Sequence, residues 1–360
     1  MPIPATPPPI ALALQGGGSH GAFTWGVLDR LLQEVEAGRL RFAAVSGTSA
    51  GALNAALAVS GLVQGGAGLA RRKLAQFWRA VSRRGVLGGN ALFYGEPNPF
   101  GGFNLDFSPV AVALEAVGLV VSPYTNPFYG DALAPLLDAA FPASDLALLN
   151  AAADGPRLFV TATDVSSNGR TIFTQPGIST AALRASAAIP TEFKAVTVGG
   201  VPYWDGDYLG NPALAPLLDH ADDLVLVLVN AFRRDAMPPR TAPAILARLN
   251  EITFNASVVL ELNAITAVNT LLDELAAAGV PYRGRYRPIR LHAVRNDAYA
   301  ETLGFASKNS TSWAFLTALR DTGYATAEAW VAAHLGDLGH RSSFDAKTEL
   351  TDRVLKARAP

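Results

Sequence analysis

Two short apolar segments, each followed by a glycine-rich turn, constrain the fold of this chain more than any other feature. Residues 10–14 precede the loop 16–21 (GGGSHG), and residues 42–45 precede the pentapeptide 47–51 (GTSAG). Continuous apolar runs of this length are typical of buried strands in a parallel sheet. Between them, apolar residues recur every four positions over 22–36, which predicts an amphipathic helix. We therefore expect a strand–loop–helix–strand–turn–helix unit with both turns at one edge of a sheet.

The rest of the chain continues this alternation of strands and helices. Further strands are predicted over 158–163, 170–174, 196–198, 202–204, 224–229 and 289–294. Further helices are predicted over 50–59, 69–82, 131–141, 180–188, 213–218 and 245–278, the last with one break, and in the C-terminal part. Such alternation predicts a three-layer α/β/α fold with a mostly parallel central sheet. The closely spaced strand pairs predict antiparallel hairpins at its edge.

The chain divides into four regions by composition. Residues 1–9 are rich in proline and predict an extended arm. Residues 10–230 carry the α/β pattern, interrupted at 85–130 by a segment dense in Gly, Pro and aromatic residues. Such an insertion is either a lid that contacts substrate or a packed loop with no ligand. Residues 231–360 predict a mostly helical extension packed on the same domain.

Composition excludes several classes of function. The net charge is −1 and no basic stripe occurs, which argues against nucleic-acid binding. The chain has no cysteine, so disulfides and thiol catalysis are excluded. No run of about 18 apolar residues predicts a spanning helix. The mean hydropathy of +0.22 is nevertheless high, as in proteins with a buried sheet, an apolar pocket or lipid contact. The N-terminus does not resemble a secretory signal, so we expect a cytoplasmic protein, with peripheral contact at a membrane or lipid surface left open.

The pentapeptide Gly47-Thr48-Ser49-Ala50-Gly51 fits the G-x-S-x-G pattern of a nucleophile elbow. In that motif the serine lies at a strained turn between a strand and a helix, and small flanking residues let the two elements approach each other. A buried strand before it and a helix of small residues after it match this context. We interpret Ser49 as a nucleophile; the alternative is a structural turn.

The loop Gly16-Gly17-Gly18-Ser19-His20-Gly21 has three interpretations. A dinucleotide-binding loop requires an acidic residue at the end of the next strand, where Ser46 stands instead. A plain tight turn is the second interpretation. The third is an oxyanion hole at a helix N-terminus, which the serine elbow on the adjacent strand favours. In that case the loop Gly16 to Gly18 supplies backbone donors, Gly17 and Gly18 foremost, and Ala50 N–H adds another.

A serine nucleophile needs a base, and histidine is not the best candidate here. Of the five histidines, His20 is placed to line the site, and His292 lies within an apolar strand and is expected in the core. Asp205 follows a short strand and precedes Gly206, so a partly buried carboxylate there is suited to take the serine proton. Asp207 is the local competitor, and a simple turn at Asp205-Gly206 is the remaining interpretation.

These three motifs resemble the signature blocks of patatin-like phospholipases, and they occur in that family's order. Residues 159–164 and 185–190 resemble its intervening segments, so the resemblance covers residues 10–230. The remainder resembles the helical extension of a bacterial subgroup. The resemblance implies a three-layer α/β/α fold and a serine lipid acyl hydrolase with Ser49 as nucleophile and Asp205 as base. It implies no metal and no cofactor.

The resemblance also gives four glycines a supporting role in the motifs: Gly21, Gly47, Gly51 and Gly206. The chain departs from the family's pattern at Gln15, where many members have an acidic residue, and at Asp207, where Gly or Ala is common. The expected partner is a lipid or acyl-ester substrate. Two alternatives stay open: an esterase or thioesterase acting on non-phospholipid acyl or storage-polyester substrates, and a catalytically weak lipid-binding module. Oligomeric state and headgroup preference cannot be predicted.

Overall fold

The structure is a computed structural model that describes residues 7–84, 121–127, 129–232, 234, 238–281 and 286–349. Most of the arm 1–9 and of the insertion 85–130 therefore lies outside the described residues. The strands are β1 Pro9–Leu14, β2 Arg41–Thr48, β3 Arg157–Asp164, β4 Gly169–Thr174, β5 Val196–Val198, β6 Val201–Asp205, β7 Asp223–Val227 and β8 Arg290–Val294. The helices are α1 Gly21–Glu36, α2 Ala50–Arg84, α4 Leu133–Ala140, α5 Ala143–Ala151, α6 Thr180–Ser186, α7 Ala242–Ala277, α8 Asp297–Glu301, α9 Trp313–His334 and α10 Ala346–Glu349.

The eight strands form one mixed sheet, in the order β5-β6-β3-β2-β1-β7-β8, with β4 also paired to β3. The five strands from β3 to β8 in this order are mutually parallel. Strands β4 and β6 run antiparallel to β3, and β5 and β6 form a hairpin through Gly199 and Gly200. The expectation of a mostly parallel sheet with hairpins at one edge is confirmed.

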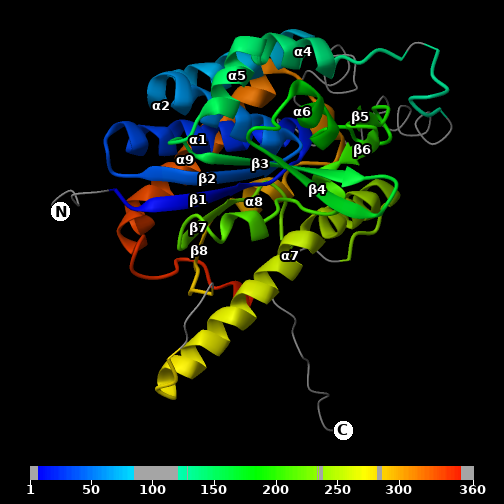
Figure 1. The fold of residues 1–360 in the computed structure, drawn as a ribbon. Helices are drawn as coiled ribbons and strands as arrows, with labels where there is room; N and C mark the ends of the chain where they lie inside the picture. Colours follow the sequence, from blue (N-terminus) through cyan, green and yellow to red (C-terminus); the bar gives the residue numbers. More distant parts are fainter. Residues whose placement is uncertain are drawn as a thin grey trace, which may run out of the picture.

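Helices cover both faces of the sheet, which gives the predicted three layers (Figure 1). In β1, Ile10, Leu12 and Leu14 belong to the core formed with α1, α2 and α9. Ala11 and Ala13 belong to a second core, which is formed with α7 and the segment around Leu217. This alternation is the period of two of a strand that is buried on both faces.

Several elements differ in length from the sequence predictions. The two helices expected over 50–59 and 69–82 are both present in α2, where they extend to meet at Gly65 and Gly66, whose backbone is non-helical. Helix α7 is longer than expected and has no break, and α5 was not predicted. The helix expected over 213–218 is only a short 3₁₀ turn. These differences arise where small residues weaken the helical pattern or where packing extends it.

Helix α2 is apolar and long enough to cross a membrane, judged by length and composition alone. Within its most apolar window, however, 61% is buried inside the protein, and a core helix meets the same criterion. Most of its buried side chains pack against the sheet and against α1. We therefore assign α2 to the core layer.

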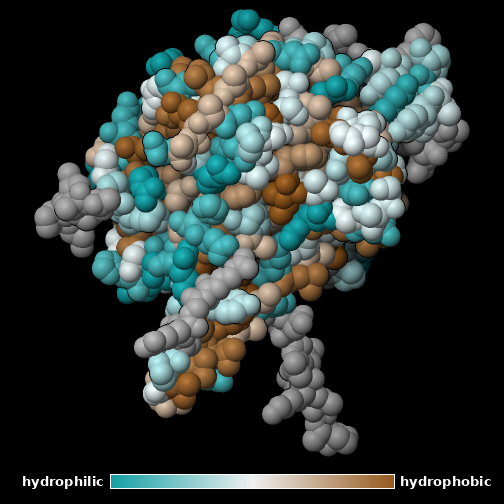
Figure 2. All heavy atoms as spheres, viewed as in Figure 1, coloured by the Kyte–Doolittle hydropathy of each residue, from teal (hydrophilic) through white to brown (hydrophobic). Residues whose placement is uncertain are grey.

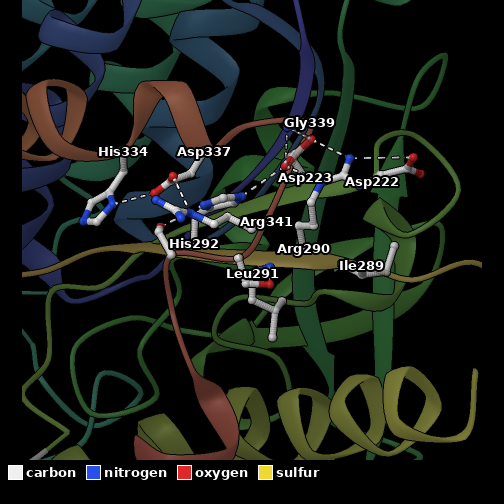
Figure 3. A network of polar contacts seen from close by, with 12 residues as sticks. Asp222, Asp223, Ile289, Arg290, Leu291, His292, His334, Asp337, Gly339 and Arg341 are labelled. Atoms are coloured by element: carbon white, nitrogen blue, oxygen red, sulfur yellow. Dashed lines mark hydrogen bonds and ion pairs between the residues drawn. The ribbon is translucent and has the colours of Figure 1, made fainter. Parts of the chain in front are cut away.

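A polar network ties the C-terminal part of the chain to the amino ends of β7 and β8 (Figure 3). Arg290 donates to both carboxylate oxygens of Asp223, at 2.9 and 2.8 Å, and the Gly339 amide donates to the same group. These donors hold the pKa of Asp223 well below its usual range, although burial acts in the opposite direction. His292 lies 3.1 Å from Asp223 and 2.8 Å from the Ser343 hydroxyl. The network thus positions the segment after α9 beside the edge strand β8.

Candidate active site

The ends of β2 and β6 meet on the same edge of β3. Strand β4 pairs with β3 over residues 159–164 and therefore occupies one of its two edges. On the other edge, Thr48 of β2 pairs with Thr161, and Asp205 of β6 pairs with the next residue, Ala162. The residue that follows Thr48 therefore lies beside Asp205. This register explains how Ser49 and Asp205 come together although they are far apart in the chain.

Ser49 has the strained backbone of a nucleophile elbow. Its φ is +53°, a left-handed conformation that non-glycine residues rarely adopt. Its amide donates to the hydroxyl of Ser186, at the end of α6, over 3.0 Å. Ser49 is only 3% exposed. The turn is thus held from outside the motif by a serine that the sequence analysis did not single out.

The Asp205 carboxyl group is fully buried and is positioned by its backbone. The Asp205 amide donates to Ala188 O at 2.9 Å, and its carbonyl accepts from the Thr163 hydroxyl at 2.8 Å. Oδ1 accepts from the Asp207 amide at 2.8 Å. Oδ2 has no partner of good hydrogen-bond geometry among the described residues, so it stays available to the neighbouring serine.

Burial raises the pKa of Asp205 well above its ordinary value, and the nearby charge of Asp207 raises it further. The Asp207 amide and the Ser49 hydroxyl act in the opposite direction, because both favour the ionised carboxylate. The Ser49 hydroxyl therefore lies beside the Asp205 carboxylate, in a contact that is long or poorly aligned. Such contacts are common in active sites without substrate. A carboxylate whose pKa is raised binds a proton more strongly and is therefore a better general base.

Asp207 is a second buried carboxylate in the site. A Cβ atom added to Gly16 would lie 2.1 Å from Asp207 Oδ1 and 2.8 Å from Ser49 Cβ, so both groups crowd the same side of Gly16. Asp207 Oδ1 has no hydrogen-bond partner in the described part of the chain. Burial raises the pKa of Asp207 to about 7, and the positive charge of Lys308 partly opposes this. The site therefore contains two carboxyl groups that do not both ionise easily.

The glycine loop offers some of the expected backbone donors. Gly16 N–H already donates to Asn211 Oδ1 at 2.6 Å, so the expectation that Gly16 is a free oxyanion donor needs correction. The amides of Gly17 and Gly18 have no hydrogen-bond acceptor among the described residues, and neither does Ala50 N–H at the start of α2. Gly18 has φ +58°, and its Cα faces the Lys308 carbonyl, where a Cβ would lie at 2.6 Å. These three amides remain available for an oxyanion.

The four supporting glycines lie where main chains approach closely. A Cβ on Gly51 would lie 2.3 Å from Leu14 O, and one on Gly206 would lie 2.3 Å from Thr161 O. The same construction on Gly47 meets Gly51 O at 2.4 Å, and on Gly21 it meets the side chain of Ala50 at 2.7 Å. A side chain at any of these positions would collide with the segment packed against it and displace it.

Gln15 is the centre of a buried network that the sequence analysis missed. Its Oε1 accepts from the amides of Val229 and Asn230 at 2.9 and 3.0 Å. Its Nε2 donates to Asn255 Oδ1 of α7 at 2.8 Å and more weakly to Asn211 O. The network joins the ends of β1 and β7 to α7 and to the loop that holds Gly16. Its members are far apart in the chain, so no local pattern indicated them.

Neither of the two histidines considered from the sequence contacts Ser49. His20 Nε2 lies 2.8 Å from the Ser307 hydroxyl, and burial together with Lys308 lowers the pKa of His20 to about 3. Its ring is therefore neutral at physiological pH. His292 is fully buried in the middle of β8, as expected for a core residue. The ionisable group that the β3 register places beside Ser49 is the carboxyl group of Asp205.

Comparison with known proteins identifies the family of this chain. Among solved structures, VipD from Legionella pneumophila is similar at 16% identity, with 88% of this chain and 67% of VipD covered and a TM-score of 0.36. That likeness is too weak to bear on function. No curated protein sequence is similar to this chain. The model of the patatin-like phospholipase family, in contrast, matches residues 12–218, which span the glycine loop, the elbow and Asp205. The chain therefore belongs to the patatin-like phospholipase family, and this membership supports a lipid acyl hydrolase activity.

Proposed function

We propose that the chain is a serine lipid acyl hydrolase of the phospholipase A type, with Ser49 as nucleophile and Asp205 as base. The observation that carries the proposal is the strand register, in which consecutive residues of β3 hold the ends of β2 and β6. The strained φ of Ser49 and the raised pKa of Asp205 support the same assignment. Family membership supports a lipid ester as substrate.

The reaction takes place in two steps. In the first, Asp205 takes the proton of the Ser49 hydroxyl while Oγ attacks the ester carbonyl carbon. The tetrahedral intermediate then collapses, the alcohol leaves with the proton from Asp205, and an acyl-enzyme remains. In the second step, Asp205 takes a proton from water, the hydroxide attacks the acyl-enzyme, and Ser49 regains its proton as the fatty acid leaves.

The free amides near Ser49 hold the negative oxygen that forms in both steps. Gly17 and Gly18 offer two donors at the N-terminus of the 3₁₀ turn Gly18–His20, and Ala50 offers a third at the start of α2. Backbone donors that are already fixed in place need no reorganisation when the charge develops, and losing one typically costs about 3 kcal/mol of transition-state stabilisation. The bond from Gly16 N–H to Asn211 keeps the loop in this shape.

The test uses hydrolysis of a soluble short-chain ester and labelling by a fluorophosphonate. Ser49→Ala is expected to lose labelling and at least about 10³-fold in kcat. Asp205→Asn is expected to lose activity to a similar degree, since the variant cannot accept the proton. Ser60→Ala is the control, because this buried serine of α2 bonds only Gln64 in the described structure. Labelling of Ser49→Ala at the rate of the unmodified chain would overturn the assignment.

The substrate class is tested separately, with a panel of acyl compounds. Phospholipids are expected to release fatty acid faster than short acyl esters, acyl thioesters or polyester fragments at equal acyl concentration. If a thioester or polyester fragment is the preferred substrate, the alternative of a non-phospholipid esterase replaces the phospholipase assignment. Lipid binding without turnover of any ester would support the third interpretation, a lipid-binding module.

A further inference from the structure

Helix α7 carries an apolar face that points away from the protein. Buried side chains of α7, including Phe254, Val258 and Leu262, pack toward the body. The residues on the opposite side are exposed and apolar: Ile245, Leu249, Ile252, Ala256, Leu260, Ala264, Ala267 and Leu271. We call this set the outer face of α7. At about 1.5 Å per residue it is about 40 Å long, and it continues along the part of α7 that projects from the body (Figure 1).

Three leucines of this face are more than half exposed. Leu249 is 54% exposed, Leu260 is 69% exposed and Leu271 is 54% exposed. Figure 2 shows hydrophobic residues along the projecting part of α7, beneath the more polar surface of the body. Contiguous apolar surface of this extent on a folded protein marks a site of interaction.

The outer face carries no ionisable group. Between residues 245 and 271 the ionisable residues of α7 are Arg248, Glu251 and Glu261, and each is paired toward the body. Arg248 bonds Glu251 at 3.0 Å, and Glu261 accepts from the amides of Leu214 and Ala215. The polar residues that adjoin the face are neutral, for example Thr253 and Asn263. A partner that binds here therefore needs no charge complementarity.

The spacing of the face does not suit a left-handed coiled coil with a second helix. Its eight positions advance from 245 to 271 in seven steps, or about 3.7 residues per step, whereas a left-handed coiled coil requires about 3.5. Partner helices are also usually selected by charged residues beside the apolar seam, and α7 has none there over this range. A straight, uncharged ridge instead fits a flat apolar boundary, such as the region between headgroups and acyl chains of a lipid layer.

The side of α7 that faces the body forms part of the active-site wall. Asn255 accepts from Gln15, and the Ser257 hydroxyl accepts from the Asn211 amide at 2.9 Å. Phe254 packs edge-on against Tyr208, beside Asp207. A surface that binds the outer face is therefore one helix away from the glycine loop and the catalytic pair.

We infer that the outer face of α7 docks on the surface of an electrically neutral lipid layer, such as phosphatidylcholine, and holds the active site at that surface. The choice of a lipid layer over other apolar partners rests in part on the proposed lipid acyl hydrolase function. Binding by apolar burial alone is expected to be insensitive to ionic strength and to need no anionic lipid.

The test measures flotation of the full chain with phosphatidylcholine vesicles, in parallel with hydrolysis of a soluble short-chain ester. Leu260→Gln and the triple variant Leu249→Gln, Leu260→Gln, Leu271→Gln are compared with Leu148→Gln. Leu148 is the matched control, because it is 55% exposed on α5, which lies on the opposite side of the sheet from α7 (Figure 1). The single α7 variant is expected to weaken vesicle binding several-fold and the triple variant at least tenfold. The control is expected to bind like the unmodified chain, and all variants are expected to keep the soluble activity.

Three results would overturn the inference. One is unchanged vesicle binding by the triple variant. Another is binding that requires added phosphatidylglycerol and disappears at high salt. The third is a dimer of the unmodified chain, seen by size exclusion, that the triple variant converts to monomers; the outer face would then be covered by a second copy. If the unmodified chain does not hydrolyse the soluble ester, the proposed function is contradicted. The docking inference is then decided by the vesicle binding of the variants alone.

Discussion

Replacing Asp207 with asparagine is expected to stabilise the folded protein at pH 8 but much less at pH 5. Burial raises the pKa of Asp207 from its ordinary value of 3.8 to about 7. The folded state therefore holds this proton more tightly than the unfolded chain does. Below about pH 4, Asp207 is protonated in both states and does not change the free energy of unfolding. Above that pH, its ionisation in the unfolded chain destabilises the folded state, and this cost grows until the pH reaches about 7. A shift of about three units corresponds to about 4 kcal/mol, taken as an upper bound.

The measurement is urea unfolding of the unmodified chain and of Asp207→Asn at pH 5 and pH 8. The stability advantage of the variant should increase by about 2 to 3 kcal/mol between these two pH values. Asp154→Asn is the control, because Asp154 lies on the surface and should give no such increase. An equal difference between variant and unmodified chain at both pH values would refute the burial argument.

The same substitution should also move the pH dependence of catalysis. The negative charge of Asp207 raises the pKa of Asp205, so removing that charge lowers it. Asp205 must be ionised to act as a base, and the acidic limb of the rate profile should therefore shift to lower pH in Asp207→Asn. If the acidic limb does not move in Asp207→Asn, the charge of Asp207 does not affect the pKa of the base.

Three further substitutions probe the surroundings of the site. Gly16→Ala should lower ester hydrolysis by at least about 10²-fold, because the new Cβ collides with Asp207 and Ser49; wild-type kcat would contradict the geometry. Ser186→Ala removes the acceptor of the Ser49 amide, so kcat should fall by an amount that corresponds to about 1 to 3 kcal/mol in activation free energy. An unchanged kcat would show that the elbow keeps its conformation without this hydrogen bond. Gln15→Leu leaves the amides of Val229 and Asn230 unpaired, and urea unfolding should show a loss of about 2 to 6 kcal/mol; a loss under 1 kcal/mol would mean that water or a shifted side chain replaces the bonds.

The site residues predicted from the sequence lie at positions whose backbone conformation or close packing allows few residue types. A serine in a left-handed elbow and glycines at close main-chain contacts leave a local pattern that is readable without a structure. The five parallel strands were predicted because buried parallel strands are continuous apolar runs. The three antiparallel strands were predicted from their close spacing as hairpins. Residue Asp205 was found by its position after a strand and before a glycine. The structure adds the reason for its place, which is its register on β3.

The polar residues that hold the site together were not predicted. Gln15, Ser186 and Asn211 each act through partners that are distant in sequence, and ordinary Gln, Ser and Asn residues give no local signal. The expectation that Gly16 donates to the oxyanion failed for the same reason, because its acceptor lies in a distant loop. The two helices predicted within α2 are present on either side of Gly65 and Gly66, whose backbone is non-helical, but their inner ends were predicted too short.

The shared edge of β3 has a consequence for how this protein tolerates insertions and deletions. Because consecutive residues of β3 hold the ends of β2 and β6, loops elsewhere between Ser49 and Asp205 can change in length without changing the distance between the two side chains. One added residue inside β3 between Thr161 and Ala162 would act differently. It would displace β6 by about 3.4 Å relative to β2 and turn every following side chain to the opposite face. Strand β3, which contributes neither Ser49 nor Asp205, therefore cannot change in length at this point without separating them.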